Sequence, residues 1–122
     1  MKILLYSKSN FIKDELKKEN SFFKELTVIK SLENIKKDIE SNSSLVVLHH
    51  LNDFENDINI FSDLIKEYKN IYLIALSNTP TNLEGCKLLR TGYKSYLHSL
   101  SNYQILKSAV ESVVTGNIYL YP

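Results

Sequence analysis

The sequence has one cysteine, three glycines, two prolines and no tryptophan among its 122 residues. The single cysteine, Cys86, excludes an internal disulfide and a multi-cysteine metal site, which is typical of proteins in a reducing compartment. So little glycine and proline excludes collagen-like and low-complexity chains. No apolar run approaches the roughly 20 residues of a membrane span, and no signal-peptide pattern follows Met1. We therefore expect one domain, residues 1–122, in the cytoplasm and without a membrane partner.

Charge of one sign is scarce as well. The 15 basic residues against 14 acidic ones leave a formal net charge of +1. Proteins that bind nucleic acid directly usually carry a strongly basic patch, because the phosphate backbone dominates their affinity. We therefore expect that this domain does not itself contact nucleic acid.

Five short runs of apolar, β-branched or aromatic residues predict strands at residues 3–6, 26–29, 45–48, 71–76 and 93–97. The third and fourth runs are apolar on both faces, as buried parallel strands are. Apolar residues with helical spacing lie between and after the strands, in five sets: Ile12/Leu16, Leu32/Ile35/Ile39, Ile58/Phe61/Ile65/Tyr68, Leu83/Cys86/Leu89 and Ile105/Ala109/Val110/Val113. Ser9, Ser31 and Ser101 are candidate N-caps, and Gly92 and Gly116 are candidate helix ends.

Alternating strands and helices predict an α/β fold, a (βα)5 doubly wound five-stranded parallel sheet with strand order 2-1-3-4-5. In such sheets the working crevice lies outside the carboxyl ends of the strands. The residues at these ends are Ser7, Lys8 and Ser9 after the first strand, His49 and His50 after the third, Ser77 and Asn78 after the fourth, and His98 and Ser99 after the fifth.

Two segments carry a resemblance to a known family. Residues 88–97, LLRTGYKSYL, lead into the fifth strand, and residues 109–122, AVESVVTGNIYLYP, close the chain. Both are similar to the receiver domains of two-component response regulators, and the second is typical of the NarL-like branch. The resemblance spans the whole chain and implies the flavodoxin-like fold predicted above.

The resemblance fails at the residues that carry the family's chemistry. A working receiver phosphorylates an aspartate, holds a divalent metal on an acidic pair, and presents a hydroxyl and a lysine to the phosphoryl group. By alignment the acidic pair falls on Ser7 and Lys8, the acceptor on His49, the hydroxyl on Ser77 and the lysine on Ser99. A shift of one residue places His50 at the acceptor position, which is still not an aspartate. Because magnesium needs hard oxygen ligands, we expect no metal, no cofactor and no phosphorylation at this degenerate pocket.

Other residues have more than one interpretation. Three histidines suggest a metal site, but His49 and His50 are neighbours on a strand and point to opposite faces. Lys8 is either a solvated lysine or a partner for Asp53 or Glu55 across the crevice. Cys86 is expected in the core, on the apolar side of its helix.

An aromatic group near the end of the sequence suggests a contact surface. Tyr96 lies at the position of the family's aromatic switch, and is either fixed in one state or a surface anchor. Tyrosines gather late in the chain, at Tyr93, Tyr96, Tyr103, Tyr119 and Tyr121. Tyr93, Tyr96 and Tyr103, with Arg90 and Lys94, predict a homodimer or other protein contact through the face of the helix near 83–89, the fifth strand and the last helix. A dimer through the first and last helices is the alternative.

We therefore expect an atypical response-regulator receiver, a pseudo-receiver, that is not an enzyme and works through phosphorylation-independent protein contacts in signal transduction and transcriptional regulation. DNA would be reached only through a separate helix-turn-helix domain, if one follows Pro122. Two alternatives are a small-molecule sensor that uses the vacated acidic pocket, and a flavodoxin-like domain whose loop Ser7-Lys8-Ser9-Asn10 cradles a phosphate.

Overall fold

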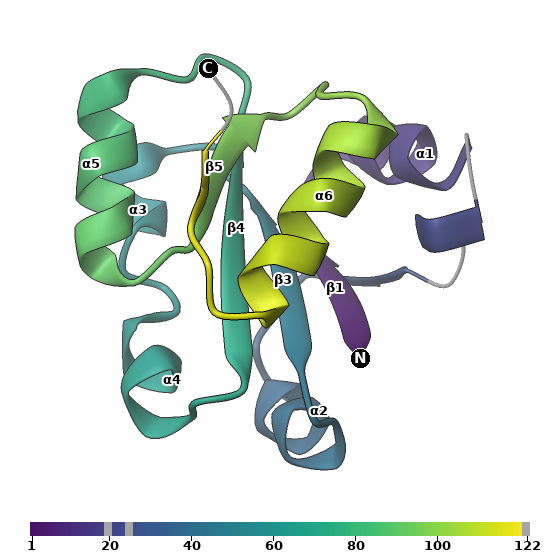
Figure 1. The fold of residues 1–122 in the computed structure, drawn as a ribbon, viewed down its shortest axis with the longest axis vertical. Helices are drawn as coiled ribbons and strands as arrows, with labels where there is room; N and C mark the ends of the chain where they lie inside the picture. Colours follow the sequence, from purple (N-terminus) through teal and green to yellow (C-terminus); the bar gives the residue numbers. More distant parts are fainter. Residues whose placement is uncertain (19–20, 24–25, 121–122) are drawn as a thin grey trace.

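A parallel β-sheet forms the centre of the protein in the computed structural model, which describes residues 1–18, 21–23 and 26–120 (Figure 1). The strands are β1 Lys2–Tyr6, β2 Thr27–Ile29, β3 Leu45–His50, β4 Ile71–Ser77, β5 Ser95–His98 and β6 Tyr119–Leu120. They are ordered β2-β1-β3-β4-β5-β6, and each neighbouring pair is parallel. The α/β class and the order 2-1-3-4-5 are therefore confirmed, with one further strand at the β5 edge.

The sixth strand is an addition to the five-stranded prediction. Tyr119 pairs with Ser95 and Leu120 with Tyr96. The backbone N–H of Tyr119 donates to the carbonyl of Lys94 (3.0 Å), and the Ser95 hydroxyl donates to the carbonyl of Tyr119 (2.6 Å). A strand of two residues is too short to show an alternating pattern, so its pairing comes from tertiary contacts alone. Tyr121 and Pro122 lie outside the described residues.

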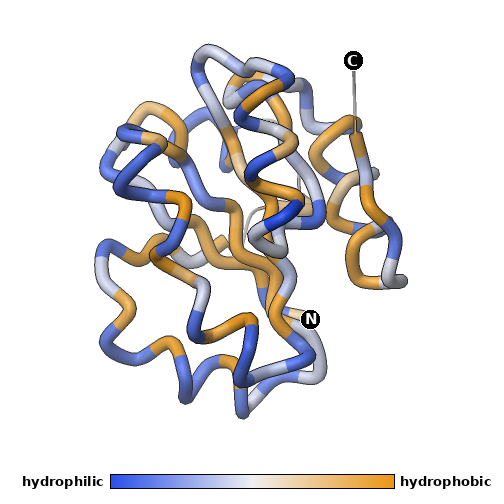
Figure 2. Tube along the Cα trace, turned by 90° about the vertical axis from the view of Figure 1, so that its left-hand side faces the viewer, coloured by the Kyte–Doolittle hydropathy of each residue, from blue (hydrophilic) through white to orange (hydrophobic). Residues whose placement is uncertain are grey.

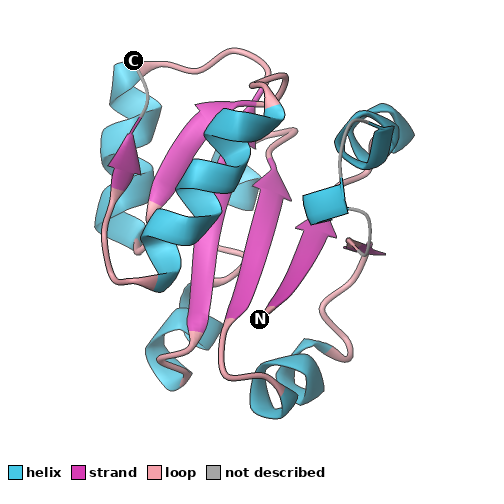
Figure 3. Ribbon diagram, turned by 45° about the vertical axis from the view of Figure 1, so that its right-hand side comes forward, coloured by secondary structure: helices cyan, strands magenta, loops and turns pink. Residues whose placement is uncertain are grey.

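The central strands are apolar on both sides because helices cover both faces of the sheet (Figure 2). The helices are α1 Asn10–Lys18, α2 Ile35–Ser41, α3 Phe54–Asp57, α4 Ser62–Glu67, α5 Asn82–Thr91 and α6 Tyr103–Val114, with a 3-10 helix, η1, at Ser21–Phe23. Helices α1 and α6 pack on one face, while α2, α4 and α5 pack on the other (Figure 3). Successive residues of β3 alternate between the two cores: Val47 joins the α5 side and Leu48 the α6 side.

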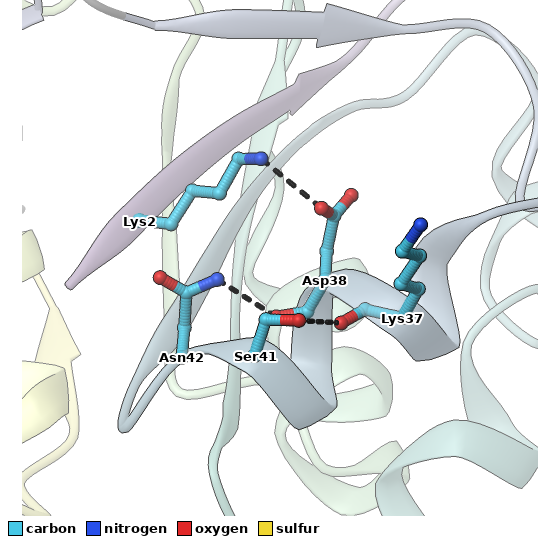
Figure 4. Close-up of polar contacts among 5 residues, drawn as sticks. All are labelled: Lys2, Lys37, Asp38, Ser41 and Asn42. Atoms are coloured by element: carbon cyan, nitrogen blue, oxygen red, sulfur yellow. Dashed lines mark hydrogen bonds and ion pairs between the residues drawn. The ribbon is translucent and has the colours of Figure 1, made fainter.

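One ion pair joins helix α2 to β1, and two hydrogen bonds close the C-terminal end of the helix (Figure 4). Lys2 Nζ of β1 lies 3.0 Å from Asp38 Oδ1, and both side chains are partly exposed. The Ser41 hydroxyl donates to the carbonyl of Lys37 (2.7 Å), and Asn42 Nδ2 donates to the carbonyl of Asp38 (2.8 Å). Water screens such a surface ion pair, so it adds little to stability.

Two predicted helices differ from the observed ones. Of the set at residues 58–68, only Ile65 lies within a helix, α4; Ile58 is the C-cap of α3, and Phe61 and Tyr68 are the N-cap and C-cap of α4. The short α3 begins at a turn in which the Asp57 carboxylate accepts the backbone N–H groups of Asn52 (2.7 Å) and Asp53 (3.0 Å). In α5 the buried residues are Gly85 and Leu88. The set Leu83/Cys86/Leu89 therefore does not face the core, and Cys86 is exposed, which corrects the prediction of a core cysteine.

The predicted helix ends are confirmed more often than the predicted starts. Gly92 (φ 119°) is the C-cap of α5, a left-handed conformation that favours glycine, and Gly116 (φ 93°) follows α6. The Ser9 hydroxyl accepts the N–H of Ile12 (3.4 Å) at the start of α1. Ser31 and Ser101 are not caps, because Asn34 precedes α2 and Asn102 precedes α6.

No helix among the described residues is long and apolar enough to cross a membrane.

The N-cap of α6 gives a direct test of the fold. Asn102 Oδ1 accepts the backbone N–H of Ile105 (3.0 Å), so Asn102→Ala should lower the free energy of unfolding by about 1 kcal/mol. Ser101→Ala, one residue earlier, is the matched control and should leave stability unchanged within roughly 0.5 kcal/mol. Urea denaturation of both variants measures the difference, and equal losses would contradict the assigned cap.

Candidate functional site

Four polar side chains meet at the carboxyl ends of β1, β3, β4 and β5. Ser7 Oγ lies 3.0 Å from His50 Nδ1, and His50 Nε2 lies 3.1 Å from Asn78 Oδ1. The Ser99 hydroxyl donates to the same Asn78 oxygen at 2.5 Å. We call these four residues the crevice network. It lies where the sequence predicted the working crevice, and each of its members is one of the predicted strand-end residues.

The hydrogen-bond directions in the crevice network follow from its acceptor. Asn78 Oδ1 can only accept, so His50 Nε2 donates to it. In the neutral ring Nδ1 then accepts, and the Ser7 hydroxyl donates to it. Ser7 Oγ in turn accepts the backbone N–H of Ser9 (3.0 Å). The network thus joins four strands without a carboxylate, a lysine or an arginine.

Three of the four members of the crevice network are buried, whereas Asn78 is exposed. Ser7, His50 and Ser99 are only 3%, 4% and 5% exposed. Their polar atoms bond to one another and leave little surface for a small ligand or a phosphate. The two alternatives that place a ligand at this crevice therefore gain no support from the geometry.

Ser77 and Lys8 lie beside the crevice network. Ser77 is 6% exposed and its hydroxyl accepts the N–H of Thr79 (3.1 Å). Lys8 is exposed and forms no ion pair with any described residue, so the pairing with Asp53 or Glu55 is not observed. The Asp53 carboxylate instead accepts a hydrogen bond from Asn56 (2.7 Å).

His49 does not belong to this group, which corrects the predicted degenerate pocket. It pairs with Tyr6 across β1 and β3 and points to the opposite face of the sheet from His50. Side chains alternate along a strand, so the His50 side chain points toward Ser7 and the His49 side chain points to the other face of the sheet. The acceptor position at the crevice is thus occupied by His50, the residue that a one-residue shift of the alignment selects.

His49 lies in an aromatic cage inside the core. Its ring makes edge contacts with Tyr6 (5.3 Å between centroids) and Phe61 (5.1 Å), and Nδ1 lies 2.6 Å from the Tyr93 hydroxyl. His49 Nε2 has no hydrogen-bond partner among the described residues. Burial lowers the pKa of His49 to about 4, and burial also raises the pKa of Tyr93. Both groups are therefore neutral at pH 7, with the Tyr93 hydroxyl donating to His49.

Tyr96, the predicted switch residue, has its side chain turned into the protein. The hydroxyl accepts the N–H of Thr81 (2.9 Å) and donates to Glu84 Oε1 (3.1 Å). A β-carbon on Gly85 would come within 2.9 Å of the ring, so Tyr96 lies against α5 only because residue 85 is glycine. Burial raises the pKa of Tyr96. Of the two interpretations of Tyr96, the fixed position fits these contacts.

The predicted contact surface changes as a consequence. Tyr93 is 1% exposed and Tyr96 is 8% exposed, so neither is a surface anchor. Tyr103 and Lys94 are partly exposed, and Arg90 is exposed. The sequence does not reveal that Tyr93 and Tyr96 are buried, because both tyrosines belong to a run of residues with an ordinary strand pattern.

The histidines do not form a metal site. His98 is exposed, and its Nδ1 accepts the N–H of Leu100 (3.0 Å). Over residues 1–18, 21–23 and 26–120, no three His, Cys, Asp or Glu side chains lie close enough to hold a metal ion.

Sequence reasoning did not single out Gly85, Thr81 and Glu84, which hold Tyr96. A glycine inside a helical pattern was the available signal, because it often marks a close contact.

No family model and no curated protein matches the chain. Solved structures do. An atypical orphan response regulator with a phosphorylation-independent regulatory mechanism has a TM-score of 0.72 and 18% identity, over 95% of this chain and 97% of that one. An orphan response regulator of H. pylori has a TM-score of 0.71 and 18% identity, over 93% and 96%. The receiver domain of NarL from Mycobacterium tuberculosis has a TM-score of 0.72 and 14% identity, over 95% and 97%. The chain therefore has the fold of response-regulator receiver domains.

The buried His49 predicts a specific dependence of stability on pH. The unfolded chain takes up a proton on this residue below its ordinary pKa of 6.5, whereas the folded chain does so only near 4. The free energy of unfolding should therefore fall as the pH decreases from 6.5 to 4, by about 3 kcal/mol from this group. Urea denaturation across this range measures it. His49→Gln should lose this part of the pH dependence, whereas the exposed control His98→Gln should keep it; equal slopes in both would contradict the assignment.

The contact between Gly85 and Tyr96 predicts a non-additive pair. Gly85→Ala should lower the free energy of unfolding by roughly 1 kcal/mol, because crowding of the ring outweighs the better helix propensity of alanine. In a Tyr96→Leu background the same change should be neutral or stabilising. A double-mutant cycle by urea denaturation measures the coupling, and additive effects would show that the ring does not limit residue 85.

Proposed function

We propose that this chain is an atypical receiver that acts in signal transduction and transcriptional regulation through phosphorylation-independent protein contacts, and that it catalyses no reaction. The crevice network carries the proposal. Phosphoryl transfer to a receiver needs a carboxylate acceptor, carboxylates for the metal and a cation for the developing charge. Ser7, His50, Asn78 and Ser99 supply none of these, and each of their bonds is made to another protein group.

The contact surface that we propose is the face of α5, β5 and α6. Arg90 and Lys94 lie on it with exposed or partly exposed side chains, and Tyr103 lies at the start of α6. Tyrosine offers a large contact area, and the cations suit an acidic rim on a partner. Contact through α1 and α6 is the alternative surface, with Phe11 exposed on α1. DNA would be contacted only through a separate helix-turn-helix domain, if one follows Pro122.

Phosphodonors test this function directly. Incubation with acetyl phosphate and magnesium should leave the intact mass unchanged, and beryllium fluoride with magnesium should leave the amide NMR spectrum unchanged. His49→Asp and His50→Asp should each stay unlabelled, because acceptor, metal ligands and lysine act as a unit. A receiver with an intact aspartate site is the positive control. A mass increase of one phosphoryl group on a crevice residue of the wild-type chain would overturn the proposal.

A further inference from the structure

A groove of about 950 Å³ lies between helix α5, strand β5 and helix α6 (Figure 1). Its apolar lining comes from α5, β5, β6, α6 and the loop before α6: Leu89, Tyr96, Leu120, Ile105 and Leu100. None of the described lining residues is Asp, Glu, Lys or Arg. Small-molecule sites are typically concave, mostly apolar and roughly 300–1,000 Å³ in volume. A groove of this kind suits an uncharged occupant, because an ion would lose its hydration without gaining a counter-charge.

Tyr96 gives the groove a preformed wall. Its hydroxyl accepts the N–H of Thr81 (2.9 Å) and donates to Glu84 Oε1 (3.1 Å). Its ring packs against Gly85, where a β-carbon would come within 2.9 Å of it. These contacts fix a side chain that lines the groove, so an occupant would not have to order it on binding.

Uncharged polar groups gather at one end of the groove. Thr81 and Asn82 begin α5, while His98 ends β5 and Ser101 follows it, so all four lie at the carboxyl edge of the sheet. His98 Nδ1 accepts the N–H of Leu100 (3.0 Å), so Nε2 carries the hydrogen in the neutral ring. Nε2 has no hydrogen-bond partner among the residues that the structure describes. This end of the groove can therefore donate a hydrogen bond to a ligand oxygen.

The other end of the groove is apolar. Leu89 lies seven residues after Asn82 on α5, which is about 10 Å along the helix. Leu120 pairs with Tyr96, two residues before His98 on β5, and its side chain is 57% exposed. The groove thus has a polar end and an apolar end separated by about 10 Å.

We infer that this groove binds an uncharged, mainly apolar small molecule of about that length, with a hydrogen-bond acceptor at one end. The acceptor oxygen lies at His98, and the hydrocarbon part lies along Tyr96 and Leu89. The site is distinct from the degenerate pocket, where the crevice network bonds to itself. The inference goes beyond the proposed function and does not depend on it. An occupant would also cover part of the face of α5, β5 and α6.

Titration with naphthyl methyl ketone, followed in the amide NMR spectrum of the 122-residue chain, tests the site. The ketone should bind with a dissociation constant of about 1 mM or lower and shift amide signals of α5 and the end of β5. Naphthoate has the same rings and a carboxylate in place of the ketone. It should bind at least about tenfold more weakly, because no cation is found in the described lining. Absence of shifts, or equal affinity for the two compounds, would overturn the inference.

Two variants of α5 test the location of the site. Cys86 is exposed and lines the groove, so Cys86→Phe should fill the space and weaken binding of the ketone at least about tenfold. Leu83 is 68% exposed on the same helix and does not line the groove, so Leu83→Phe is the matched control and should leave the affinity unchanged. Thermal unfolding of both variants should match the wild type, because both replaced side chains are exposed. Equal affinities of the two variants would overturn the location.

His98→Leu and His98→Gln test the polar end of the groove. Both remove the contact with the N–H of Leu100, but only glutamine keeps an N–H donor. His98→Leu should weaken binding of the ketone about fivefold, and His98→Gln should retain most of the affinity. Equal losses would overturn the role of His98 as the donor. A chain that takes up phosphate would refute the proposed function, whereas an unlabelled chain that binds no ketone would refute only this inference.

Discussion

Polar side chains buried at the carboxyl edge of a parallel sheet must find partners inside the protein, and the rest of this structure depends on how that requirement is met. The edge is where four strands bring Ser7, His50, Asn78 and Ser99 together. A buried charge there would require a metal or a counter-ion, because desolvation of an isolated ion is costly. Four side chains that include no carboxylate, lysine or arginine bond to one another instead. The crevice network of this receiver fold therefore links the carboxyl ends of β1, β3, β4 and β5 by hydrogen bonds.

The same requirement acts differently on the other face of β3. His49 has one nitrogen paired with Tyr93 and the other without a partner among the described residues, inside a cage of Tyr6, Phe61 and Tyr93. The edge contacts direct the positive rim of one ring to the face of another, which offsets part of the lost hydrogen bond. Two adjacent histidines thus have opposite roles: His50 links the strand ends, and His49 fills the core at the cost of sensitivity to acid.

Much of the fold could be predicted from local patterns, and the site only in part. The alternation of strand-like and helical segments predicted the strand order, and the observed strand pairing agrees with that order. The prediction of which side of α5 faces the core was wrong, because a helical period marks a stripe of residues without saying whether that stripe is buried. The contact of the Tyr96 ring with Gly85 determines which side of α5 faces the sheet. The choice between His49 and His50 depended on a register of one residue, and the pairing of Tyr6 with His49 sets that register. The prediction placed the N-cap of α6 at Ser101 and not at Asn102, because serine and asparagine both cap helices and these two residues are neighbours.

A receiver that is switched by phosphate needs two states and a ligand that distinguishes them. The contacts in this chain favour a single conformation and offer no site for a phosphoryl group that would select another one. The crevice network contains no carboxylate that could accept a phosphoryl group, and the Tyr96 side chain is held by Thr81, Glu84 and the space over Gly85. A domain with one state can still transmit information, because association depends on concentration and on competing partners through mass action.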